Sequence, residues 1–239
     1  MKKYIINITV MGLGVALGIF VSSKLNILTN VNSEVIKLDV GNSTNKTDVD
    51  NVEKIEDELV LVESVYDGFV IDLRYATKDN ITKKVLYPEQ LCYLQKNTLE
   101  KLIQVNEELR LKGYKIKIWD AYRPLSVQKK LWATYPNANY IANPFSKGSN
   151  HNRGAAVDIT LVDLYGKPVP MPTGFDEFGP KAHRGYKASA EAVKNVDMLT
   201  EMMEKYGFKK INTEWWHFDD VDCSKYPVRD HSFRDLLKK

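Results

Sequence analysis

The fold is decided by one stretch, which reads Ser149-Asn150-His151-Asn152-Arg153-Gly154-Ala155-Ala156-Val157-Asp158. Its aspartate stands in an apolar alternation that continues to Leu161, a pattern typical of a strand. A carboxylate in such a strand costs free energy unless a cation or a hydrogen-bond donor receives it. Gly154 allows the backbone to turn between His151 and Asp158. We therefore expect a loop that leads into a buried strand, with a histidine and an aspartate that share one ion.

Strand patterns lie on both sides of this stretch, without the regular strand–helix–strand rhythm of a parallel sheet. Short apolar and alternating runs predict strands at residues 59–62, 69–73, 114–119 and 157–161. Residues 208–218 are predicted to form a final strand pair. The order of these patterns predicts an α+β fold with a central antiparallel sheet and flanking helices.

Three longer helices are predicted between these strands. The first opens at Pro88 and ends before Gly113, and its apolar face comprises Leu91, Leu94, Leu99, Leu102 and Leu109. The others cover residues 125–135 and 192–206. Segments 136–150 and 166–185, rich in Asn, Pro and Gly, predict long loops, which in compact domains are usually functional or mobile.

The 239-residue chain begins with an export pattern. Lys2 and Lys3 precede a mostly apolar run, so residues 1–24 predict a signal peptide or an N-terminal membrane anchor, of which we favour the anchor. The lysines place the rest of the chain outside the membrane. Residues 25–57 predict a flexible linker, with a ragged domain edge as the alternative. The domain is therefore expected at residues 58–239, extracytoplasmic, with membrane contact only through the N-terminal segment.

Charge and cysteine content exclude some function classes. A net charge of +3 and the lack of long basic runs give no support to a nucleic-acid partner. Cys92 and Cys223 lie far apart without Cys-x-x-Cys spacing, which argues against a thiolate zinc site or a redox motif. Two separate buried thiols are expected, and one disulfide is the alternative in an exported chain.

The positions of the histidines point to metal binding. The chain has four, and two of them stand in clusters with an acid, His151 near Asp158 and His217 near Glu214. A catalytic zinc ion takes three protein ligands and keeps one position for water. We therefore predict one zinc ion per chain, on the sheet, held by His151, Asp158 and His217.

A zinc-bound water still needs a base, and Glu214 in the cluster Glu214-Trp215-Trp216-His217 is the candidate. Residues three apart on a regular strand face opposite sides, so Glu214 and His217 share a site only if the segment is twisted, bulged or turned. The alternative is that the tryptophans are core side chains and Glu214 is a surface acid.

Arg123 stands between a predicted strand end and Pro124, an exposed position suited to function. An arginine there could stabilise a developing oxyanion beside zinc. A salt bridge with the neighbouring Asp120 is the alternative.

Five motifs, in order over about residues 73–218, resemble those of the zinc D-alanyl-D-alanine dipeptidases, the VanX-type enzymes of vancomycin resistance and peptidoglycan metabolism. Their wider family also contains D,D-carboxypeptidases. The motifs are Leu73-Arg74-Tyr75-Ala76-Thr77 with Asn80, Trp119-Asp120-Ala121-Tyr122-Arg123-Pro124, Ser149-x-His151-x-x-Gly154-x-Ala156-x-Asp158, Met171-Pro172-Thr173-Gly174-Phe175-Asp176 followed by Ala182-His183, and Glu214-Trp215-Trp216-His217.

The resemblance implies a role for each matching residue. The zinc ligands are His151, Asp158 and His217, as the chemistry above predicts. Glu214 is implied as general base and acid, and Arg123 as the residue that stabilises the transition state. Ser149 is implied to help bind substrate, and Asp176 to face the free ammonium of a dipeptide.

The implied function is zinc-dependent hydrolysis of the D-alanyl-D-alanine dipeptide to D-alanine, in peptidoglycan metabolism outside the cytoplasmic membrane. A D,D-carboxypeptidase and a non-catalytic cell-wall-binding zinc module are the alternatives. Two departures from the family stand out, Pro172 in place of a common glycine and the export segment. His183 is expected to be structural, and His231 to lie in a charged surface helix at residues 229–239.

Overall fold

The computed structural model describes residues 57–238. The predicted signal or anchor segment and all of the predicted linker except residue 57 lie outside this range. Among the described residues, the helices are all too short or too polar to cross a membrane.

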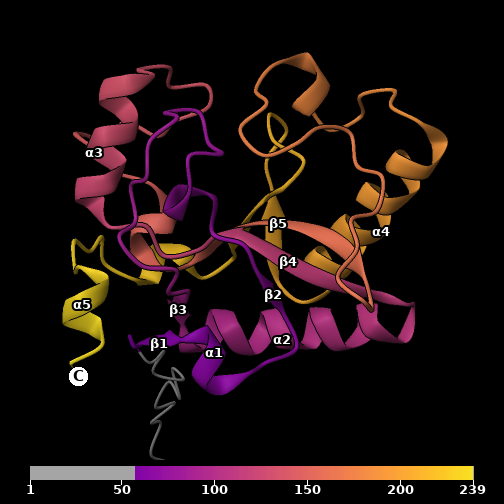
Figure 1. Ribbon diagram of the computed structural model, residues 1–239, viewed down its shortest axis with the longest axis horizontal. Helices are drawn as coiled ribbons and strands as arrows, with labels where there is room; N and C mark the ends of the chain where they lie inside the picture. Colours follow the sequence, from indigo (N-terminus) through magenta and orange to yellow (C-terminus); the bar gives the residue numbers. More distant parts are fainter. Residues whose placement is uncertain (1–56, 239) are drawn as a thin grey trace, which may run out of the picture. The chain divides into compact units, whose positions relative to one another are not determined.

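A five-stranded sheet forms the centre of the domain (Figure 1). Its strand order is β2 (Val70–Ile71), β4 (Tyr114–Asp120), β5 (Ala156–Asp163), β7 (His217–Asp220) and β6 (Phe208–Lys210). Only the edge pair β2–β4 is parallel, and the other pairs are antiparallel. The predicted α+β fold with a central antiparallel sheet is therefore confirmed. A separate two-stranded sheet pairs β1 (Leu59–Leu61) with β3 (Tyr93–Gln95).

Helices leave one face of the central sheet to the site. Helix α2 (Lys96–Leu111) packs against β4 and against α4 (Ala190–Lys205), and it runs beneath the sheet in Figure 1. Ile118 pairs with Ile159 on neighbouring strands, and both are fully buried. Because side chains alternate along a strand, Asp158 faces away from Ile159. The remaining helices are α1 (Val62–Val65), α3 (Leu125–Thr134), α5 (Phe233–Leu236), and the 3₁₀ turns η1 (Arg74–Ala76), η2 (Asn150–Arg153), η3 (Pro180–Ala182) and η4 (Cys223–Lys225).

The start of the first long helix was predicted wrongly. Helix α2 begins at Lys96 rather than Pro88, because residues 93–95 pair with β1 as strand β3. Leu94 is buried from that strand, whereas Leu99, Leu102 and Leu109 are buried from the helix as predicted. A buried leucine fits either pattern, so strand pairing decides the boundary. The first two predicted strands are also shorter than expected.

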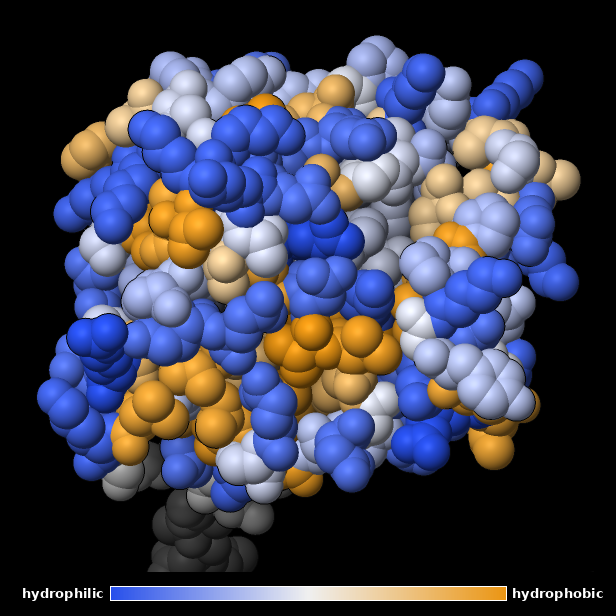
Figure 2. Space-filling view, in the orientation of Figure 1, coloured by the Kyte–Doolittle hydropathy of each residue, from blue (hydrophilic) through white to orange (hydrophobic). Residues whose placement is uncertain are grey.

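The C-terminal tail is more than a charged surface helix. Phe233 of α5 is 3% exposed, and its ring contacts those of Tyr87, Tyr93 and Tyr122. The many charged residues of the tail led to the prediction of a surface helix and gave no sign that Phe233 is buried. The surface that Figure 2 shows is mostly hydrophilic, with apolar residues in several separate patches, one of them near β1. Both cysteines are unpaired, as expected, although Cys223 is only half-buried.

Candidate metal centre and active site

The first ligand segment is a capped turn followed by a strand. Turn η2 begins after Ser149, whose hydroxyl accepts a hydrogen bond from the backbone N–H of His151 at 3.2 Å. The Ser149 N–H in turn donates to the side-chain oxygen of Asn152 at 2.8 Å. This capping box fixes the turn that carries His151. Gly154 ends it in the left-handed region, with φ +68°. The chain then enters β5, which presents Asp158.

The central strands bring the other ligand beside Asp158. In the sheet register, Asp158 lies opposite His217 of β7 on one side and opposite Asp120 of β4 on the other. Asp158 is 3% exposed, so its carboxylate is removed from bulk water.

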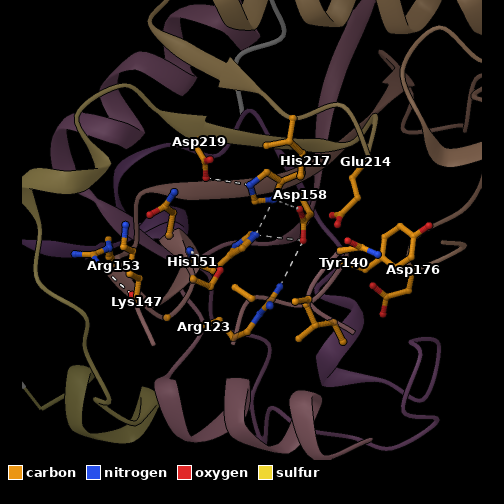
Figure 3. Close-up of a pocket in the computed structure, with 18 of the residues that line it drawn as sticks. Arg123, Tyr140, Lys147, His151, Arg153, Asp158, Asp176, Glu214, His217 and Asp219 are labelled. Atoms are coloured by element: carbon orange, nitrogen blue, oxygen red, sulfur yellow. Dashed lines mark hydrogen bonds and ion pairs between the residues drawn. The ribbon is translucent and has the colours of Figure 1, made fainter. Parts of the chain in front are cut away.

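His151, Asp158 and His217 form the one group among the described residues that could hold a metal ion (Figure 3). Nε2 of His151 lies 3.2 Å from Nδ1 of His217. One Asp158 carboxylate oxygen lies 2.9 Å from Nδ1 of His217, and the other lies 3.4 Å from Nε2 of His151. The three side chains are therefore close enough to share one metal ion.

The outer nitrogens of both rings have acceptors, which fixes the proton of each neutral ring. Nδ1 of His151 donates to the Ala121 carbonyl at 2.8 Å, and Nε2 of His217 donates to the Asp219 carboxylate at 3.0 Å. The inner nitrogens thus turn lone pairs toward each other and toward Asp158. Such an arrangement is repulsive unless a proton or a cation lies among the three donors.

The electrostatics of the centre show the same demand for positive charge. Burial disfavours a charged His217, yet hydrogen bonds to Asp158 and Asp219 raise its pKa well above the ordinary value. Burial likewise opposes ionisation of Asp158, yet the charges and hydrogen bonds of the two histidines hold its pKa well below the usual range. The donor set and its charge fit a divalent metal.

Glu214 lies in an irregular segment before β7. Strand alternation therefore does not force Glu214 and His217 to face opposite sides of the sheet. Residues 212–216 form bends and turns, and β7 starts only at His217. Glu214 is 6% exposed, and its carboxylate makes no hydrogen bond or ion pair with the described residues. Burial raises the pKa of Glu214 to about 8. Trp215 and Trp216 are indeed fully buried core side chains, but the idea that Glu214 is a surface acid was wrong.

The salt bridge weighed for Arg123 is present, and the side chain is buried at 6% exposure, so the expectation of an exposed position was wrong. Its Nε donates to the Asp120 carboxylate at 2.8 Å, and its Nη2 lies 3.6 Å from the Asp158 carboxylate. Nη1 donates to the Gln128 side chain at 2.8 Å, and the Gln128 amide donates in turn to the Ala142 carbonyl. The salt bridge therefore holds the guanidinium at the edge of the metal centre.

All seven predicted site residues line one cavity of about 470 Å³, and Ser149 and Asp176 are among them. Asp176 has φ +58°, and its carboxylate accepts the Ile81 N–H at 3.0 Å. Burial raises the pKa of Asp176 to about 7. Figure 3 places Asp176 at one end of the cavity and Lys147 at the other, with the three metal-ligand candidates between them.

Sequence reasoning missed two residues that support the second ligand segment. Asp219 stands two residues after His217, and the alternation of a strand could have placed both on one face. Arg184 donates to the carbonyls of Ile211 at 2.8 Å and His217 at 3.2 Å, and no local pattern marks it. His183 does not line the cavity, in agreement with its expected structural role.

Comparison with known proteins identifies the family of the chain. The family described as D-ala-D-ala dipeptidase (Peptidase_M15) matches residues 55–235. The D-alanyl-D-alanine dipeptidase of Escherichia coli (strain K12) is 36% identical over 172 residues, which cover 72% of this chain and 89% of that protein. The protein of the same name from Enterococcus faecium is 30% identical over 178 residues, covering 66% and 88%.

A solved structure, VanYB in complex with D-Alanine-D-Alanine, is 15% identical and covers 56% of this chain and 75% of its own, with a TM-score of 0.37. That likeness is too remote to bear on the site. The family match and the identities to the dipeptidases show that this chain belongs to the D-alanyl-D-alanine dipeptidase family of M15 peptidases.

Proposed function

We propose that the protein is a zinc enzyme that hydrolyses D-alanyl-D-alanine to two molecules of D-alanine. The observation that carries this proposal is the position of Glu214, a buried and unpaired carboxylate in the same cavity as His151, Asp158 and His217. Binding a metal requires only the last three residues. Hydrolysis also requires a general base, and the unpaired carboxylate of Glu214 beside them can serve as one.

The chain's own residues supply the proton transfers and the charge stabilisation. Zinc, when bound by His151, Asp158 and His217, would acidify a water and polarise the peptide carbonyl. Glu214 takes a proton from the attacking water as the new C–O bond forms, and passes it to the amine as the C–N bond breaks. Its raised pKa, about 8, suits a group that must hold that proton between the two steps. Arg123 faces the negative charge that develops on the carbonyl oxygen.

Charges at the two ends of the cavity support a dipeptide as substrate. Asp176 at one end can pair with a free ammonium group, and Lys147 at the other can pair with a free carboxylate (Figure 3). A zwitterionic dipeptide in this orientation has its peptide bond near Glu214. The Ser149 hydroxyl lines the cavity beside His151, where it can also bind the substrate.

We further propose that this hydrolysis occurs outside the cytoplasmic membrane, in peptidoglycan metabolism. The support is the basic and then apolar pattern of residues 1–24. Protease protection of the C-terminal domain in intact spheroplasts would contradict this location.

The test offers the zinc-loaded, purified protein free D-Ala-D-Ala and N-acetyl-D-Ala-D-Ala, with release of D-alanine as the readout. We expect the free dipeptide to have the higher kcat/KM, because the acetyl group removes the charge that Asp176 pairs with. Preference for the acetylated peptide would instead identify a D,D-carboxypeptidase. Turnover of neither would identify a zinc-binding module.

A further inference from the structure

The Asp219 carboxylate sits behind His217, on the side of the ring that faces away from the other ligands. It accepts a hydrogen bond from Nε2 at 3.0 Å, and its side chain is only 18% exposed. The two residues are two apart on β7, so strand alternation puts them on one face of the sheet. The contact is therefore built into the strand rather than made by a free surface side chain.

A second contact joins Asp219 to the first ligand segment. The Asn150 side chain lies near the Asp219 carboxylate and, with the stronger effect of His217, helps to lower the pKa of Asp219. Asn150 lies between the cap residue Ser149 and the ligand His151 on turn η2. Asp219 thus bridges the segments that supply the two histidines, and each of its contacts restricts where His217 can point.

The two histidines differ in the group that accepts their outer N–H. Nδ1 of His151 donates to the neutral Ala121 carbonyl at 2.8 Å, with the Asp120 carboxylate farther away at 3.5 Å, whereas Nε2 of His217 donates directly to a carboxylate at 3.0 Å. A carboxylate behind an imidazole fixes the proton on the outer nitrogen, turns the lone pair of the inner one toward the metal, and strengthens it as a donor. The carboxylate also lies close enough to compensate part of the charge of a divalent ion.

We propose that Asp219 is a positioning residue that sets the ring orientation and the proton of His217, and through them the metal affinity of the centre. This inference rests on the proposed role of His217 as a zinc ligand. It adds a fourth side chain, outside the three ligands, on which metal binding depends.

The test measures the zinc Kd of the full chain by competition with a chelator, for Asp219→Ala and Asp219→Asn. Losing such an outer partner typically weakens metal affinity about 10–100-fold, and we expect a loss in this range for Asp219→Ala. Asp219→Asn retains an acceptor without the charge and should fall between Asp219→Ala and the wild type. Asp197→Asn, an exposed carboxylate on α4 that does not line the cavity, is the matched control and should leave the Kd unchanged.

A spectroscopic readout separates positioning from a general loss of structure. With Co²⁺ in place of zinc, the visible absorption reports the ligand geometry, and we expect Asp219→Ala to shift it while the melting temperature of the metal-free protein stays unchanged. A wild-type Kd together with a wild-type Co²⁺ spectrum would overturn the proposal. If Asp219→Ala does not fold, Asn150→Ala removes the second anchor and must weaken the Kd in the same direction.

These readouts need no substrate, so they are independent of the dipeptidase test. A chain that binds zinc through His217 but hydrolyses no dipeptide would refute the proposed function and leave the role of Asp219 standing. If the protein hydrolyses the dipeptide but its Asp219 variants bind zinc as tightly as the wild type, the proposed function stands and the role of Asp219 is refuted.

Discussion

The two segments that meet at the metal centre are held in place by different means. Residues 149–154 form their turn locally, through the reciprocal cap at Ser149 and the left-handed Gly154, and bonds from distant residues such as the Gln95 N–H to the Gly154 carbonyl at 2.8 Å then hold that turn in the domain. Residues 211–217 are supported from a distance, by the Arg184 side chain and by the bond from the Trp215 N–H to the Ala182 carbonyl at 3.0 Å. The turn of the first segment thus has a local source in its own sequence, whereas the turn of the second depends on the loop that precedes α4.

The two segments also differ in the functional side chains that they carry. A regular strand through Glu214 would turn it away from His217, and only an externally supported turn places both in one cavity. In the proposed mechanism both segments supply metal ligands, whereas the proposed base, Glu214, belongs to the second segment alone. Variants can therefore separate the contributions of the two segments.

The largest expected effect comes from Glu214→Gln, which removes the base and keeps the shape of the side chain. We expect kcat to fall by about 10²–10⁴-fold, the usual contribution of a general base, with zinc affinity within a few-fold of wild type. Steady-state release of D-alanine and chelator competition measure the two quantities. Activity within about tenfold of wild type would show that another group is the base.

Gly154→Ala disturbs the turn of the first segment. A Cβ atom at Gly154 would lie 2.3 Å from Cδ2 of Leu59, at a φ of +68°. Gly207→Ala is the matched control, since φ is +84° there but the nearest atom is 3.7 Å away. The left-handed conformation alone costs about 1–2 kcal/mol in each variant. Urea unfolding should show a greater loss for Gly154→Ala, and equal losses would mean that the Leu59 contact is easily relieved.

Arg184→Met attacks the second segment. It removes the donors to the Ile211 and His217 carbonyls and to the Thr200 hydroxyl, together with the guanidinium that lies over the Phe218 ring, but keeps an unbranched side chain. We expect a loss of stability of about 1–3 kcal/mol, and a larger relative loss in kcat than Gly154→Ala causes. Arg110→Met, an exposed position on α2, is the control. An unchanged kcat in Arg184→Met would show that Trp packing alone holds the turn.

The smallest effect is a shift in the pH profile of the second segment's base. The negative charge of Asp176 contributes to the raised pKa of Glu214, after the larger effect of burial. Glu214 must lose its proton to act, so kcat/KM, which follows the ionisations of the free enzyme, rises with pH through that pKa. Asp176→Asn removes a negative charge, so the rising limb should move to lower pH by a fraction of a unit. A shift to higher pH would contradict this assignment.

The same contrast explains what the sequence could predict. The first segment, the apolar face of α2 beyond Leu99 and the antiparallel centre of the sheet follow from local patterns. The turn at Glu214 does not, because its support comes from Arg184, some thirty residues away in the chain. Strand β3 and the anchoring of Phe233 likewise depend on long-range pairing and packing. Local hydrophobic periodicity cannot predict contacts between residues that are far apart in the sequence.

The pairing of Asp158 with His217 and Asp120 bears on how the chain assembles. A slip of β5 by one residue would turn Asp158 toward the buried isoleucines of the opposite face and leave a carboxylate without any partner. Only the native register allows that charge to be neutralised, by histidines or by a metal ion. The carboxylate proposed as a metal ligand therefore also disfavours misaligned sheets, and metal present during folding would favour the correct register.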